Sequence, residues 1–191
     1  SAMASTCRPT ATRTRRAALQ EENAAHRSST ATENQDSVRT TRPVEVSSSA
    51  GPATVPAKID GIRLDSTQLQ NAHTVVAIGK SMGADVADMA VALTLAYTDT
   101  KLDSNASSAG CIGAGMFLQT SQLYYGVNRT DPAAAASAWF KRLLAQENAD
   151  GNLSFAEAVL YMQSVATETT AAQYEQQHGW ATALATLLHD G

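Results

Sequence analysis

Residues 85–100 have the sequence DVADMAVALTLAYTDT and carry the clearest helical pattern in this chain of 191 residues. Asp85 is a residue type that caps helix N-termini by accepting a backbone N–H bond. Apolar residues then recur every three or four positions, the spacing that places side chains on one helix face: Val86, Met89, Ala90, Leu93 and Tyr97. The pattern predicts a buried helix, with Asp99 at or just past its C-terminal end.

Local signals predict two more helices near this segment. One pattern begins at Asp65 or Ser66 and ends at Gly83, a residue type that terminates helices by adopting the left-handed conformation. Farther along the chain, Asp131-Pro132 opens another helix, because proline is well tolerated at the first helical position. Helices on both sides of residues 85–100 favour a mainly α fold.

The C-terminal part of the chain adds two predicted helices. Ser154 and Glu157 form a capping box before a short one, and the last passes through Tyr174. Residues 58–64 alternate apolar and polar side chains around an Asp-Gly pair, which is typical of a short strand or hairpin. We therefore expect a single mainly α domain of about five to six helices at residues 58–191, with a short N-terminal strand or hairpin.

Residues 1–57 differ in composition from the rest of the chain. They contain 17 Ser or Thr residues and none of the ten aromatic residues. Such a segment cannot bury enough apolar surface to offset the entropy of ordering it, so we expect a disordered or extended Ser/Thr/Arg-rich tail. Its basic patch of Arg13, Arg15 and Arg16 could contact an anionic surface, but a solvated tail is the favoured interpretation.

The overall composition argues against several protein classes. The formal charge of −4 argues against a nucleic-acid-binding protein, which normally has a basic face. No run of residues is apolar enough to predict a membrane span. The two cysteines, Cys7 and Cys111, are too few for a disulfide scaffold and lack metal-ligand spacing. We expect Cys111 to be a lone thiol that is buried or inert.

Residues 146–157, QENADGNLSFAE, imitate a calcium-binding loop at several positions. The first position, however, is Gln146, where the ion needs a carboxylate. The alternative is favoured: Asp150-Gly151 makes a turn, and Ser154 with Glu157 caps the next helix. We therefore expect no metal and no cofactor.

Two segments resemble a known family. Residues 92–102 have the sequence ALTLAYTDTKL, and residues 115–126 have the sequence GMFLQTSQLYYG. They are similar to the motifs A-L-A-T-A-Y-Q-E-S-K-L and G-L-F-Q-Q-R-P-S-Q-G-W-G of lysozyme-like, lytic-transglycosylase-type domains of actinobacterial secreted or membrane-anchored proteins. Shorter similarities, such as that of residues 131–144, extend the resemblance over roughly residues 58–188. The resemblance implies a lysozyme-like fold.

The resemblance also implies site residues. Asp99 takes the position of the family's catalytic Glu, the general acid that cleaves a β-1,4 bond between amino sugars. No second carboxylate is assigned, and Asp103, the nearest candidate, is interpreted as a solvated loop residue. The implied substrate-binding residues are Tyr97, Phe117, Gln119, Tyr124 and Tyr125. Core positions are the alternative for the aromatic residues, and stacking on sugar is an equal alternative only for Tyr124 and Tyr125.

Four differences from the family motif fall at the expected cleft and indicate weakened or lost catalysis. Asp99 is one methylene shorter than Glu, and retracting an acid by roughly 1 Å can cost on the order of 10²-fold in rate. Leu118 replaces a Gln that could orient sugar groups, and Thr120 and Ser121 replace Arg and Pro. A working Asp-based peptidoglycan glycosidase or lytic transglycosylase remains the alternative.

The sequence-based hypothesis is a pseudoenzyme-like domain that binds peptidoglycan or a related glycan strand. The resemblance implies an extracellular or cell-envelope location, although no signal peptide is visible at the N-terminus. The alternative is a noncatalytic scaffold or assembly protein that reuses the lysozyme-like fold and binds a protein partner through residues 1–57. Neither hypothesis includes a nucleic-acid partner or a membrane span.

Overall fold

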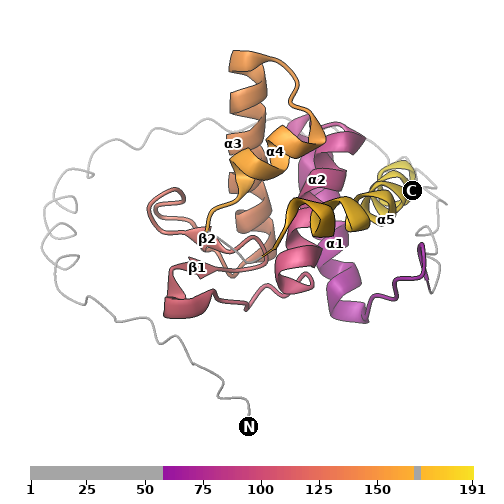
Figure 1. The fold of residues 1–191 in the computed structure, drawn as a ribbon, viewed down its shortest axis with the longest axis horizontal. Coiled ribbons are helices and arrows are strands. Elements are labelled where there is room, and N and C mark those ends of the chain that lie inside the picture. Colours follow the sequence, from indigo (N-terminus) through magenta and orange to yellow (C-terminus); the bar gives the residue numbers. More distant parts are fainter. Residues whose placement is uncertain (1–57, 166–168) are drawn as a thin grey trace, which may run out of the picture. The chain divides into compact units, whose positions relative to one another are not determined.

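The computed structural model describes residues 58–165 and 169–191, and these form a mainly α fold (Figure 1). Within that part of the chain there are five α-helices: α1 (Ser66–Met82), α2 (Val86–Thr100), α3 (Pro132–Asp150), α4 (Phe155–Met162) and α5 (Ala171–Asp190). One 3₁₀ turn, Ala109–Cys111, precedes an antiparallel hairpin of β1 (Gly113–Ala114) and β2 (Gln119–Thr120). The predicted mainly α class is confirmed, and the predicted tail at 1–57 lies outside the described residues.

The helices begin at the caps that the sequence predicts. The Asp85 side chain accepts the backbone N–H of Asp88, and the Asp88 side chain accepts the N–H of Asp85, which completes a capping box for α2. Ser154 and Glu157 form the same arrangement at α4. Gly83 ends α1 in the left-handed conformation. These interactions satisfy backbone groups that a helix end leaves without partners.

Helix α3 continues through Asp150, so residues 146–150 are helical rather than part of a loop. The Gln146 amide donates to the Asp150 carboxylate across one helical turn. Glu157 is occupied by Ser154, whose hydroxyl and backbone N–H both donate to it. The predicted cap at Ser154 and Glu157 is confirmed, whereas Asp150 belongs to α3 and Gly151 follows its end, in place of the predicted Asp150-Gly151 turn.

The core is built around α2, which is buried along most of its length and packs against α1 and α5. Helix α1 also packs against α3. The Trp139 ring stacks on Phe117 at 5.4 Å between centroids and meets Phe140 edge-on at 5.1 Å. Burying side chains of this size contributes about 1.5–3 kcal/mol each, so this aromatic group holds the hairpin region against α3.

The chain outside the helices contains one expected and one unexpected feature. Ile59 and Ile62 pair across the Asp-Gly turn, as the N-terminal hairpin prediction requires. The β1–β2 hairpin is unexpected, since the strand or hairpin predicted from the sequence is at residues 58–64. The expectation for Cys111 is wrong: the residue is exposed at the end of the 3₁₀ turn, and its sulfur forms a disulfide. The other cysteine of the sequence, Cys7, lies outside the described residues.

Gly115 allows the hairpin to approach the segment before α3. Its φ is 77°, and a Cβ added there would overlap the carbonyl oxygen of Arg129. Gly126 has nearly the same φ, 76°, but a Cβ there would point into open space. The two glycines therefore separate the cost of a left-handed backbone from the cost of a backbone clash.

Replacing Gly126 by Ala should cost about 1 kcal/mol of unfolding free energy, since only the left-handed conformation is penalised. Replacing Gly115 by Ala should cost more than about 3 kcal/mol, because a backbone carbonyl must also move. Urea unfolding of both variants measures the difference. Equal losses would contradict the close approach of Gly115 to Arg129.

Candidate functional site

Asp99 lies half-buried in the last turn of α2, directly before an unusual backbone turn. Lys101 and Leu102 have φ values of 57° and 62°, the left-handed region that residues other than glycine rarely adopt. Leu102 is completely buried, which holds this turn in place. Rare backbone conformations of this kind are common at functional sites, so the turn makes the neighbouring Asp99 a candidate site residue.

Helix α1 supplies the hydrogen bonds that fix this turn. The Gln68 side-chain amide donates to the carbonyl of Lys101 at 3.0 Å, and the buried Asn71 amide donates to the carbonyl of Leu102 at 2.7 Å. The Thr100 hydroxyl donates to the carbonyl of Met116 at 2.9 Å, which ties the end of α2 to the hairpin. Three separate contacts therefore determine where α2 ends and where Asp99 lies.

The Asp99 carboxyl accepts two hydroxyl bonds at the same oxygen. Tyr174 of α5 donates to Oδ1 at 2.8 Å, and Thr169 donates to it at 3.2 Å. The Gln163 amide, just after α4, donates to the Tyr174 hydroxyl at 2.7 Å. The sequence motif gave no indication of these partners, because they come from a part of the chain some 70 residues away.

Burial raises the pKa of Asp99 above its ordinary value of 3.8. The hydroxyls of Tyr174 and Thr169 and the charge of Lys101 act in the opposite direction, because they favour the ionised form, but burial outweighs them. The carboxyl therefore keeps its proton to a higher pH than an exposed aspartic acid. That property suits a proton donor.

A pocket of about 330 Å³ adjoins the partners of Asp99. Gln163, Thr169 and Tyr174 line it on one side, and the remaining wall comes from α4 and the start of α5: Phe155, Ala156, Val159, Leu160, Ala171 and Glu175. Asp99 itself is not a lining residue. A molecule in this pocket would meet the hydrogen-bonding partners of Asp99 before it met the carboxyl.

The other expected site residues are distributed over several places. The Tyr97 ring lies 4.6 Å from the ring of Trp180, and the Lys101 ammonium lies 4.3 Å from the Tyr97 centroid. Phe117 is in the aromatic core beside Trp139. Gln119 is 0% exposed, and its side-chain amide donates to the carbonyl of Ala135 at 2.9 Å. In this arrangement Phe117 and Gln119 support the hairpin rather than face a ligand.

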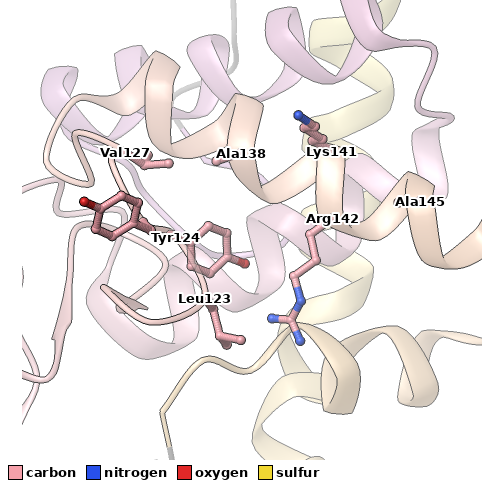
Figure 2. Close-up of a pocket in the computed structure, with 8 residues that line it drawn as sticks. Leu123, Tyr124, Val127, Ala138, Lys141, Arg142 and Ala145 are labelled. Carbon is pink, nitrogen blue, oxygen red and sulfur yellow. The ribbon is translucent and has the colours of Figure 1, made fainter.

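Tyr124 and Tyr125 line a second pocket, of about 390 Å³, on the face of α3 (Figure 2). Tyr124 is 4% exposed, whereas Tyr125 is 93% exposed. Lys141 and Arg142 of α3 also line this pocket, and the sequence analysis did not identify them. The one feature of the sequence that could have identified them is helical spacing, which places four residues on the same face of the helix: Ala138, Lys141, Arg142 and Ala145.

Within residues 58–165 and 169–191, no second carboxylate accompanies Asp99. Among these described residues, Lys101 is the charged group that influences its pKa. Asp103 is exposed and accepts the backbone N–H of Asn105 at 2.9 Å, as expected for a loop residue. Asp88 has a pKa raised to about 6, first because it is buried and further because Asp85 and Glu147 are nearby, but it lies at the opposite end of α2.

Residues 58–165 and 169–191 contain no group of three or more His, Cys, Asp or Glu side chains arranged to hold a metal ion. None of the helices in these two ranges has the length and apolar character needed to span a membrane. No protein-family model matches the sequence, and neither a curated protein nor a solved structure gives a significant match.

The raised pKa of Asp99 predicts a pH dependence of stability. As the pH rises from 3.8 through the raised pKa, the unfolded chain loses this proton before the folded chain does, so the folded state loses stability. Asp99→Asn removes the titration and keeps a side-chain oxygen as acceptor. The melting temperature of the wild type should therefore fall relative to that of Asp99→Asn between about pH 3 and pH 7.

Circular dichroism melting at several pH values measures this difference. Asp103→Asn is the matched control for replacing a carboxylate by an amide at an exposed position. The titration of Asp88 contributes equally to all three proteins and cancels. Parallel profiles for the wild type and Asp99→Asn would contradict a raised Asp99 pKa.

Proposed function

We propose that residues 58–191 form a lysozyme-like domain that binds peptidoglycan or a related glycan and cleaves it weakly or not at all. The observation that carries this proposal is the Asp99 carboxyl: it is held at the end of a buried helix, its pKa is raised by burial, and it lies behind a pocket wall. A raised pKa is what glycan cleavage requires of a general acid, whereas the position of the carboxyl behind its hydrogen-bonding partners supports weak or absent cleavage. The similarity of residues 92–102 to the family motif supports the same assignment.

The surroundings of Asp99 support weak turnover rather than efficient catalysis. Its Oδ1 already accepts hydrogen bonds from Tyr174 and Thr169, which favour the ionised form and leave Oδ2 to carry the acidic proton. Lys101 favours the ionised form, which cannot donate a proton. Glycosidases of both stereochemical types use two carboxyl groups, and within residues 58–165 and 169–191 no carboxylate near Asp99 takes the second role.

A noncatalytic assembly role is the second candidate, and the pocket beside α4 favours it. Its wall is largely apolar, and Leu160 on its edge is 75% exposed. Exposed apolar side chains beside an apolar pocket are a feature of protein-binding surfaces. In this case the domain would bind a protein in that pocket, and glycan fragments would leave the Asp99 region unchanged.

The first test separates binding from cleavage. Chitooligosaccharide and muropeptides should shift the NMR signals of the ¹⁵N-labelled chain near Asp99, while muropeptide release from cell walls should be slow. Asp99→Asn should bind equally well and abolish the remaining release, whereas Asp99→Glu should raise release by on the order of 10²-fold, because the restored methylene advances the acid.

Asp103→Asn serves as the control and should release muropeptides at the wild-type rate. Release that persists in Asp99→Asn would refute Asp99 as the acid. An absence of any glycan-induced shift would refute the glycan-binding function and leave the assembly role.

A further inference from the structure

We propose that the pocket on α3 is a recognition site for the free carboxylate of an acidic sugar. The inference rests on the proposed function for the sugar, but the carboxylate follows from the pocket itself. The pocket is separate from the Asp99 region in its lining residues, which come from the segment after β2 and from α3: Leu123, Tyr124, Tyr125, Val127, Ala138, Lys141, Arg142 and Ala145.

Two hydrogen-bond donors in this pocket have no partner in the part of the chain that the structure describes. Tyr124 is only 4% exposed, and its buried hydroxyl has no acceptor for its hydrogen. Nη1 of Arg142 is also buried and has no hydrogen bond of normal geometry, although the Tyr124 oxygen lies near enough to the guanidinium to raise the pKa of Arg142. A buried polar group without a partner is costly, and such groups in native proteins call for an explanation. Because almost none of the surface of these two atoms is exposed, a ligand oxygen satisfies them only when the side chains that cover them move aside.

The Arg142 guanidinium is held in place by its other contacts. Nη2 donates to the carbonyl of Tyr161 at 2.8 Å, and Cζ lies 4.4 Å from the centroid of the Tyr161 ring. These contacts use one edge and one face of the guanidinium and leave Nη1. In Figure 2 the Arg142 side chain extends away from α3 beside the pocket. The group is therefore already oriented before any ligand arrives.

The charge of the pocket is positive and has no internal counter-ion. Burial by itself lowers the pKa of Arg142, but the oxygens of Tyr124 and Tyr161 raise the pKa above its usual value, so the guanidinium stays charged. The one ion pair within residues 58–165 and 169–191 joins His189 and Asp190, and no acidic residue lines the pocket. A partly buried cation without a carboxylate partner favours an anionic ligand.

The number of donors indicates a carboxylate rather than a phosphate. The Tyr124 hydroxyl and Arg142 Nη1 are two donor groups, one for each oxygen of a carboxylate. A phosphate has more oxygens and would leave some without protein partners. Lys141, which is exposed, adds long-range attraction at the edge of the pocket.

The exposed ring of Tyr125 indicates the rest of the ligand. At 93% exposure it offers an almost complete aromatic face beside the two donors, with the half-exposed Leu123 next to it. Flat aromatic faces with an adjacent polar group suit ligands that have both an apolar face and hydroxyls. A sugar ring that bears a carboxylate has this combination, and the neutral sugar of the same size lacks the charged part.

The test compares two monosaccharides that differ in one group. N-acetylmuramic acid carries a lactyl carboxylate that N-acetylglucosamine lacks. NMR titration of the full ¹⁵N-labelled chain should place both at residues 123–127 and 138–145, with the acidic sugar bound at least about tenfold more tightly. Tyr125→Ala should weaken binding of both sugars, because it removes the shared aromatic face.

Tyr124→Phe provides the sharpest variant. It should weaken binding of N-acetylmuramic acid by about tenfold, leave that of N-acetylglucosamine unchanged, and leave the melting temperature unchanged or higher, because it removes an unpaired buried hydroxyl. Thr98→Val is the matched control: it also removes a buried unpaired hydroxyl, but outside the pocket, and should not alter either affinity. A purely structural role for Tyr124 would not change the preference between the two sugars.

Equal affinity for the two sugars, unchanged by Tyr124→Phe, would overturn the carboxylate inference and leave the glycan-binding function standing. N-acetylalanine or inorganic phosphate bound as tightly as N-acetylmuramic acid would overturn the assignment to a sugar. If neither monosaccharide binds and longer glycans also fail to bind, the proposed function fails together with the inference.

Discussion

The left-handed turn at Lys101 and Leu102 determines the geometry on which both the fold and the candidate site depend. The end of a helix leaves carbonyl groups without partners. Here two side-chain amides of α1 donate hydrogen bonds to the carbonyls of the turn. The burial of Leu102 offsets the cost of a conformation that residues with a Cβ avoid. Because α2 stops at this point, Asp99 lies against α5, and Thr100 reaches the hairpin.

Asp99 combines two opposing environments. Burial favours the neutral acid, whereas the hydroxyls of Tyr174 and Thr169 favour the ionised carboxylate. A general acid benefits from the first effect. It is weakened by the second, because hydrogen bonds to the carboxylate lower its pKa and occupy one of its oxygens. The Gln163–Tyr174–Asp99 chain of hydrogen bonds is thus suited to positioning α5 on α2, and this structural task explains the network whether or not sugar is cleaved.

The sequence predicted what local interactions determine. The caps at Asp85 and Ser154 and the terminating Gly83 depend on residues within one helical turn, and the structure has them as expected. The β1–β2 hairpin was missed because strands of two residues carry no periodic signal. The disulfide of Cys111 was missed because the spacing of cysteines in a sequence does not show whether a given thiol is oxidised.

The candidate site shows the same limit more clearly. A motif can identify Gln119 as a counterpart of a family residue, but it cannot show that the amide is turned inward to the carbonyl of Ala135. Conversely, Arg142 belongs to an ordinary amphipathic helix in sequence, and only its neighbours make it unusual: a carbonyl on one edge, a ring on one face, and a tyrosine hydroxyl beside a nitrogen without a partner. A domain whose residues 58–191 have an acidic excess could have neutralised that guanidinium with a carboxylate of its own. Leaving it unpaired costs stability, and ligand binding is the physical process that can recover that cost.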